Sequence, residues 1–205
     1  MRKKIGFAAI LWLCLLLPVV CSPVPTTTSS TSLTRCPRNC TCEDIAGGAV
    51  VDCKGQNLTA LPTGLPLNTT YLNVAYNSLT KLKLTHLYNL TKLEGLSVSN
   101  NDISVIKGSL KYFSNLNQVD MSTNMIQTVK ETVFGNLLQK LRLAEMSDNP
   151  LNCDCHLKWL REAVNNTELL GNNVYCANPP HLSGKRFLDV PSADFKCNYY
   201  DDLFI

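Results

Sequence analysis

Residues 93–126 read LEGLSVSNNDISVIKGSLKYFSNLNQVDMSTNMI and contain the pattern L-x-x-L-x-L-x-x-N-x-L twice, starting at Leu93 and at Leu116. Two looser copies flank this stretch, TTYLNVAYNSL at 69–79 and LRLAEMSDNPL at 141–151. Successive copies start 24, 23 and 25 residues apart, and a fixed period of this length is typical of stacked repeats. The sequence therefore predicts four repeated rungs over residues 68–151.

Each rung combines a short strand with a conspicuous asparagine. Apolar residues alternate with polar ones, as in a strand with one buried face, so four parallel strands should stack side by side. The alternating pairs are Leu72/Val74, Leu96/Val98, Val119/Met121 and Ala144/Met146. An Asn amide offers two donors and an acceptor, so the ninth residue of each rung can satisfy the turn backbone between rungs. These residues are Asn77, Asn101, Asn124 and Asn149.

Two groups of four cysteines bracket the repeats and leave the stretch between them free of cysteine. They are Cys36/Cys40/Cys42/Cys53 and Cys153/Cys155/Cys176/Cys197. Stacked repeats need atypical ends to cover their apolar core, and eight cysteines in an oxidising compartment predict four disulfides. Zinc bound at 153–156 is the alternative, but it needs reduced thiolates and the spacing lacks paired C-x2-C halves.

The chain starts with a basic, then apolar segment that is typical of a cleaved secretory signal over residues 1–21. A membrane anchor is the alternative, although Gly6 and Pro18 interrupt the apolar run. Residues 22–35 form a Ser/Thr/Pro-rich stretch that predicts a flexible leader, and residues 198–205 form a short acidic-aromatic tail with no predicted membrane span.

The formal net charge of +3 is carried by Arg2, Lys3 and Lys4, so the mature chain is nearly neutral and nucleic-acid binding is not expected.

Over residues 36–197 the chain resembles the extracellular leucine-rich-repeat family, with an amino-terminal cysteine-rich cap at 36–67 and a carboxy-terminal cap at 152–197. The resemblance implies an α/β fold: a solenoid with a curved parallel β-sheet, a convex side of irregular or short helical segments, and disulfide-bonded caps at both ends. It also implies the pairs Cys36–Cys42, Cys40–Cys53, Cys153–Cys176 and Cys155–Cys197. In wording, CDCHLKWL at 153–160 and the front cap look most like one block of the Slit axon-guidance proteins.

Inside the back cap, the spacing of Leu157, Leu160 and Val164 predicts a helix over residues 156–164 that covers the last rung. Asp154 is the residue expected to serve the amino-terminal end of this helix.

Binding is expected on the concave sheet, where outward side chains form columns across the rungs. The candidate binding residues are Tyr71, Asn73, Tyr76, Glu94, Ser97, Gln118, Asp120, Arg142, Glu145 and Asp148. Asp120 and Glu145 fall in one column about 4.8 Å apart, with like charges that repel. Arg142 is expected to neutralise them; the alternative is that they bind a basic partner or Ca²⁺.

Five N-glycosylation sequons fall outside these columns, so sugars would leave the concave face open. They start at Asn39, Asn57, Asn68, Asn89 and Asn165.

No catalytic function is expected, because His86, His156 and His181 are far apart in sequence and no nucleophile or phosphate-binding motif is present. No cofactor and no metal are predicted. The sequence favours a secreted, non-enzymatic binding module in the extracellular space or matrix that recognises a receptor, ligand or matrix protein, with a Slit-like role in guidance or adhesion. The alternative is innate-immune or matrix recognition of microbial or extracellular glycans, for which the return segments supply only scattered lysines.

Overall fold

The computed structural model describes residues 36–165 and 167–197, which contain both caps and all four rungs. The predicted signal segment, the leader and the tail lie outside the described residues. No helix in the described part of the chain has the length and apolar character needed to cross a membrane.

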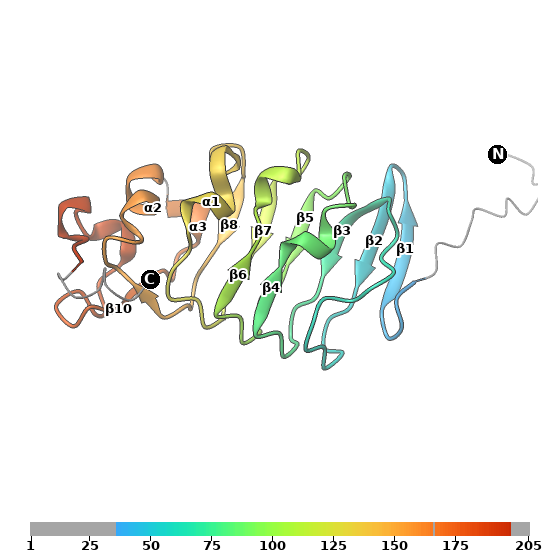
Figure 1. Ribbon diagram of the computed structural model, residues 1–205, viewed down its shortest axis with the longest axis horizontal. Coiled ribbons are helices and arrows are strands. Elements are labelled where there is room, and N and C mark those ends of the chain that lie inside the picture. The colour runs from blue at the N-terminus through green and yellow to red at the C-terminus, as the bar shows by residue number, and fades with distance from the viewer. Residues whose placement is uncertain (1–35, 166, 198–205) are drawn as a thin grey trace, which may run out of the picture. The chain divides into compact units, whose positions relative to one another are not determined.

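One six-stranded sheet runs through the repeats and into the front cap (Figure 1). Its strands are β1 (Thr41–Ile45), β2 (Gly48–Asp52), β3 (Thr69–Asn73), β5 (Gly95–Ser97), β7 (Gln118–Asp120) and β8 (Leu143–Glu145), in that order. β1 pairs antiparallel with β2 and every other pair is parallel. The four predicted rung strands are therefore confirmed, and β2 adds a parallel strand that the repeat pattern did not predict.

The segments that return from one rung to the next contain strands as well as short helices. They are β4 (Lys81–Lys83), η1 (Leu84–Leu87), β6 (Val105–Lys107), η2 (Leu110–Tyr112), α1 (Glu131–Phe134) and η3 (Gly135–Leu137). β4 and β6 pair in parallel to form a second, two-stranded sheet on the side of the core away from β3 and β5 (Figure 1). The α/β repeat fold is confirmed, but the sequence pattern did not predict this second sheet.

A single hydrophobic core lies between the main sheet and the returns. Leu72, Leu96 and Val119 are at most 1% exposed, and they share one cluster with the return residues Leu82 and Phe113. A rung cannot bury its apolar face alone, so each one depends on the rungs beside it.

The predicted asparagine ladder is confirmed at every rung. Asn101 is 8% exposed, its Oδ1 accepts a hydrogen bond from Leu79 N at 2.9 Å, and its Nδ2 donates to Val74 O at 3.1 Å and to Val98 O at 3.0 Å. Its amide therefore bonds the backbone of its own rung and of the rung before. Asn77, Asn124 and Asn149 repeat this pattern.

Four disulfides join the cysteines in the implied pairs. The zinc alternative is wrong, because the sulfurs of Cys153 and Cys155 are bonded to those of Cys176 and Cys197.

The back cap covers the last rung with small elements. They are β9 (Leu151–Asn152), α2 (Lys158–Ala163), α3 (Thr167–Leu170), β10 (Cys176–Asn178), η4 (Phe187–Asp189) and η5 (Ser192–Asp194). The expected helix is shorter than 156–164, although Leu157, Leu160 and Val164 are buried as predicted. Asp154 does not cap this helix; its carboxylate accepts a hydrogen bond from His156 N and stabilises the turn before it.

Candidate functional site

The register of the main sheet sets the candidate residues in rows across adjacent strands. We call the outward side of β3, β5, β7 and β8 the sheet face; it corresponds to the predicted concave face. One row runs Tyr71, Gly95, Gln118, Leu143, and a second runs Asp52, Asn73, Ser97, Asp120, Glu145. Sequence reasoning missed Asp52, because it lies in the front cap rather than in a rung.

Four side chains of the second row accept hydrogen bonds from the backbone just beyond their strands. Asp52 Oδ1 accepts from Lys54 N at 2.9 Å, and Asp120 Oδ1 accepts from Ser122 N at 3.0 Å. Asn73 and Glu145 make the same bond to the backbone two residues on, at 3.0 Å each. Such bonds compete with the sheet ladder and favour a turn. In Asp52, Asp120 and Glu145, one carboxylate oxygen accepts this backbone hydrogen bond and the other oxygen does not.

Ser97 departs from the expectation that this row is exposed. Its side chain is 7% exposed, and its hydroxyl lies 3.2 Å from Ser99 Oγ and 3.2 Å from Asp120 Oδ2. A short serine between longer neighbours is covered by them, so Ser97 orients Asp120 and offers little surface to a partner.

Tyr71 lies flat on the sheet because its neighbour has no side chain. A Cβ at Gly95 would overlap the Tyr71 ring and would lie 3.1 Å from Gln118 Nε2. Burial raises the pKa of the Tyr71 phenol, and the negative charges of Asp120 and Asp52 raise it further. An aromatic platform between two carboxylates therefore forms the middle of the sheet face.

Tyr76 marks the edge of the sheet face where the strands end. It is 56% exposed, and Lys54 Nζ lies 4.6 Å from the centroid of its ring. Its φ of 57° is left-handed, as are those of Asn100, Thr123 and Asp148 at the same place in the other rungs. Tyr76 thus contacts the front cap through Lys54 and keeps its other surface exposed.

The acidic pair Asp120 and Glu145 is adjacent as predicted, but Arg142 does not neutralise it. Among the described residues no ion pair joins Arg142 to either carboxylate. Arg142 precedes Glu145 by three residues, about 10 Å along an extended strand. The Glu145 carboxylate instead lies against Gly171 of the back cap. These acidic residues also belong to no group of side chains that could hold a metal ion. Among the described residues, the one such group is Cys155, His156 and Cys197, and its two cysteine sulfurs are bonded to each other.

Glu94 and Arg142 lie one residue before the paired parts of β5 and β8 and are both exposed. Asp148 is exposed at the opposite end of its rung. The structure therefore brings Tyr71, Gln118 and Asp120 together, and it sets Glu94, Arg142 and Asp148 around the margins.

The sequon asparagines are absent from both rows of the sheet face. Asn39, Asn57, Asn89 and Asn165 are exposed, whereas Asn68 is half-buried and its Oδ1 is buried without a hydrogen-bond partner. Glycosylation at these positions stays a prediction.

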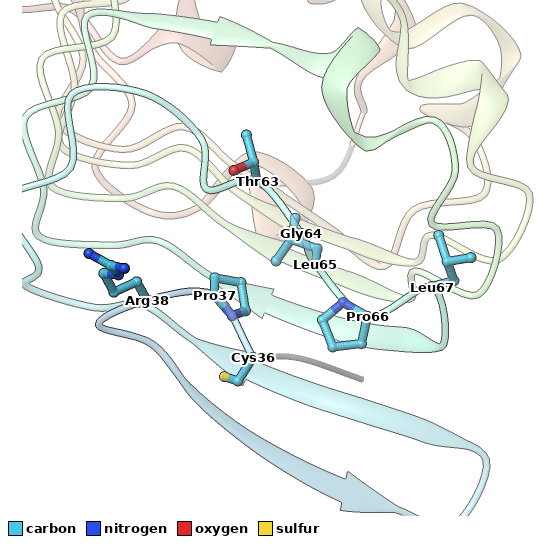
Figure 2. A pocket seen from close by; sticks show the side chains of 8 residues that line it. All are labelled: Cys36, Pro37, Arg38, Thr63, Gly64, Leu65, Pro66 and Leu67. Atoms are coloured by element: carbon cyan, nitrogen blue, oxygen red, sulfur yellow. The ribbon is translucent and has the colours of Figure 1, made fainter. Parts of the chain in front are cut away.

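A pocket of about 580 Å³ lies in the front cap (Figure 2). Cys36, Pro37 and Arg38 face the 63–67 turn across it. None of the candidate binding residues lines this pocket, and Arg38 is its one charged side chain, so it offers no acid–base pair.

Comparisons with known proteins agree with the repeats and the caps. The model of the "Leucine rich repeat N-terminal domain" matches residues 35–66, and that of the "Leucine rich repeat C-terminal domain" matches residues 173–198. The chain therefore belongs to the class of leucine-rich-repeat proteins with both terminal caps.

Two relatives that align with most of this chain show its family. The chain is 32% identical over 192 residues to Leucine-rich repeat-containing protein 3 of Danio rerio, covering 91% of this chain and 68% of that protein. It is 33% identical over 175 residues to Leucine-rich repeat-containing protein 3B of Bos taurus, covering 82% and 64%. The chain belongs to the leucine-rich-repeat family of these proteins and spans about two thirds of their length.

More distant similarities concern single domains or the fold. Oligodendrocyte-myelin glycoprotein of Homo sapiens is 30% identical over 199 residues, covering 82% of this chain and 43% of that protein. A chain in the structure of the Toll–Spatzle complex of Drosophila superposes with a TM-score of 0.60 at 24% identity, covering 79% of this chain and 22% of its own length. These matches support the capped repeat fold and do not support the narrower resemblance to Slit.

Proposed function

We propose that this chain is a secreted, non-enzymatic recognition domain that binds an extracellular protein through the sheet face, with Tyr71 at the centre of the contact. The observation that carries the proposal is the platform formed by Tyr71 over Gly95, beside Gln118 and between Asp52 and Asp120. Capped leucine-rich-repeat domains typically bind proteins, and the four disulfides suit an oxidising extracellular compartment.

The chemistry of the platform favours a basic side chain of the partner. A Lys or Arg placed on the Tyr71 ring would gain a cation–π contact and the attraction of two carboxylates. Tyr is enriched at the energetic centres of interfaces because it buries a large area with little loss of rotamer entropy. The partner that fits is therefore a protein with an exposed basic residue at its contact surface. Cell adhesion or guidance of the Slit kind is the setting we propose for such binding.

The experiment is an interaction screen of the purified disulfide-bonded domain against extracellular proteins, followed by variants of each hit. Tyr71→Ala and Asp120→Asn should each weaken binding about tenfold or more, the effect expected of a central contact. Tyr175→Ala is the matched control, because Tyr175 is 42% exposed in the back cap. Partner binding that survives both sheet-face substitutions, or that is lost equally in the control, would rule out this site.

A further inference from the structure

Three return segments carry a lysine at the same place in the repeat. Counting from the last residue of each rung pattern, the fourth residue is Lys83, Lys107 and Lys130. The residue before each lysine packs inward: Leu82 and Val129 are at most 2% exposed, and Ile106 is half-buried. Alternation along an extended segment then directs each lysine outward. We call these three residues the lysine column.

The second sheet brings two members of the column, Lys83 and Lys107, together in space. β4 and β6 pair in parallel with Lys83 opposite Lys107, so their strands are about 4.8 Å apart. Lys130 takes the same place in the next return, and all three lysines are exposed. Figure 1 shows β4 and β6 side by side on the face of the core away from β3 and β5. Lys83 and Lys107 were among the lysines that the sequence left scattered, because the repeat pattern did not predict this strand pairing.

No ion pair joins Lys83, Lys107 or Lys130 to an acidic side chain among the described residues. Glu131 is the acidic residue next to Lys130 in the chain, and it is exposed. Lys81 adds another exposed positive charge on β4. Like charges directly opposite each other on neighbouring strands are destabilising. A ligand with repeated negative charges would relieve this repulsion.

An exposed aromatic ring lies close to the column. Tyr112 is 57% exposed, its ring centroid is 4.7 Å from that of Tyr88, and Lys111 Nζ lies 5.1 Å from the centroid of Tyr112. The Tyr88 hydroxyl accepts a hydrogen bond from Ser109 N, two residues after Lys107. Tyr88 therefore connects Tyr112 to the backbone that follows Lys107. A flat ring next to cations can pack against the apolar face of a sugar whose sulfate groups reach the lysines.

We propose that the lysine column and Tyr112 form a binding site for a linear sulfated polysaccharide of the glycosaminoglycan class. Regular spacing from rung to rung suits a polymer that carries charge at repeated intervals. The disulfides favour an oxidising compartment, where nucleic acid is not the expected polyanion. Binding to a membrane surface would require a broad apolar patch. In β4, β6, η1 and η2 the large exposed apolar residues are Val105 and Tyr112 alone, which is too few for such a patch. This site is separate from the sheet face, so either proposal can fail without the other.

The test compares two triple variants of equal charge in binding to immobilised heparin at about 0.15 M salt. Lys83→Gln/Lys107→Gln/Lys130→Gln removes the column, and Lys140→Gln/Lys185→Gln/Lys196→Gln removes three exposed lysines elsewhere. The column variant should bind at least about tenfold more weakly and show a shallower dependence of log affinity on log salt, because fewer counterions are released. The control variant should change affinity less than about twofold, and Tyr112→Ala should also weaken binding.

The proposal is overturned by no heparin binding of the unmodified domain, by equal weakening in the two triple variants, or by equal binding to desulfated heparin. Tighter binding to vesicles containing phosphatidylserine than to heparin would assign the column to membranes instead. The thermal unfolding midpoint of each variant is measured to verify that the fold is intact. It should change little, because all the substituted lysines are exposed. Protein-partner binding through Tyr71 should be unchanged in the column variant.

Discussion

The side chain of Asn101 makes four backbone hydrogen bonds across two rungs, to Leu79 N, Val74 O, Val98 O and Ser99 O. Asn101→Ala removes these four bonds, each worth about 1 kcal/mol, and leaves the buried Leu79 N–H without a partner. Val74 O, Val98 O and Ser99 O keep hydrogen bonds from Asn77 Nδ2, Asn124 Nδ2 and Tyr76 N. We expect a loss of about 3 kcal/mol in the free energy of unfolding, measured by urea denaturation. Asn115→Ala is the control, because Asn115 is exposed and its amide donates to Thr91 O alone. Equal losses in the two variants would contradict the ladder.

Thr123 carries backbone strain that Asn100 and Asp148 avoid at the same place in the repeat. Its φ is 51°, which is unfavourable for a β-branched residue, whereas Asn100 holds the equivalent place in the preceding rung at 53°. Thr123→Asn should therefore raise the free energy of unfolding by about 1 kcal/mol, and Asn100→Thr should lower it by a similar amount. A change of the same sign in both variants would show that side-chain contacts, and not φ, decide stability here.

The raised pKa of Tyr71 gives a pH dependence with a defined sign. The folded state holds the phenolic proton more tightly than the unfolded chain, whose pKa is about 10.0. Stability from this group is therefore complete below pH 10 and is lost as the pH rises through the folded pKa. Tyr71→Phe should lose less stability than the unmodified protein above pH 10, in unfolding curves collected across that range. Asp120→Asn should lower the pKa of Tyr71, read from tyrosinate absorbance.

Single residues were predictable where the repeat pattern sets their environment. The ladder asparagines and the inward apolar pairs follow from the eleven-residue pattern alone. Asp52 was missed because β2 lies outside that pattern, and the burial of Ser97 depends on the lengths of its neighbours across the strands. The position of the Tyr71 ring depends on Gly95, which pairs with it 24 residues away.

Among the elements, the rung strands were predictable and the strands of the returns were not. β4 and β6 have three residues each and pair only because the rungs already hold them side by side. Helix α2 was found by the spacing of its apolar residues, but its start was misplaced because Asp154 bonds within the preceding turn. Short elements in a solenoid are set by neighbouring rungs more than by local propensity.

The back cap should depend strongly on its central disulfide. Cys153 and Cys176 are at most 1% exposed, and their bond closes a loop between residues 23 apart in sequence. Cys153→Ala/Cys176→Ala should lower the free energy of unfolding by about 3 kcal/mol through loop closure, with a further loss from the cavity. Cys36→Ala/Cys42→Ala, whose loop has a separation of 6, should lose less. Denaturation of the two variants under the same conditions gives the comparison, and equal losses would contradict it.

On the scale of the whole molecule, a small formal net charge of +3 hides two surfaces of opposite charge. Asp52, Asp120 and Glu145 share a row on the main sheet, and Lys83 and Lys107 lie opposite each other on the second sheet. Net charge and sequence spacing could not separate these groups, because the two sheets sort the residues by their place in the repeat. The fold class followed from the period and the cysteine groups, whereas the charged surfaces required the strand register.

Both ends of the solenoid must be covered for the rungs to persist. Ala144, Met146 and Leu151 in the last rung are fully buried, and they belong to one core with Leu157, Leu160 and Leu170 of the back cap. Deleting residues 152–205 would expose this apolar end to water. We expect the truncated chain to associate in size-exclusion chromatography and to lose the sharp thermal transition of the full domain. Deletion of 198–205 alone is the control, since it keeps Cys197 and the disulfide to Cys155. A truncated chain that stays monomeric and melts cooperatively would mean that the repeats are stable without their cap.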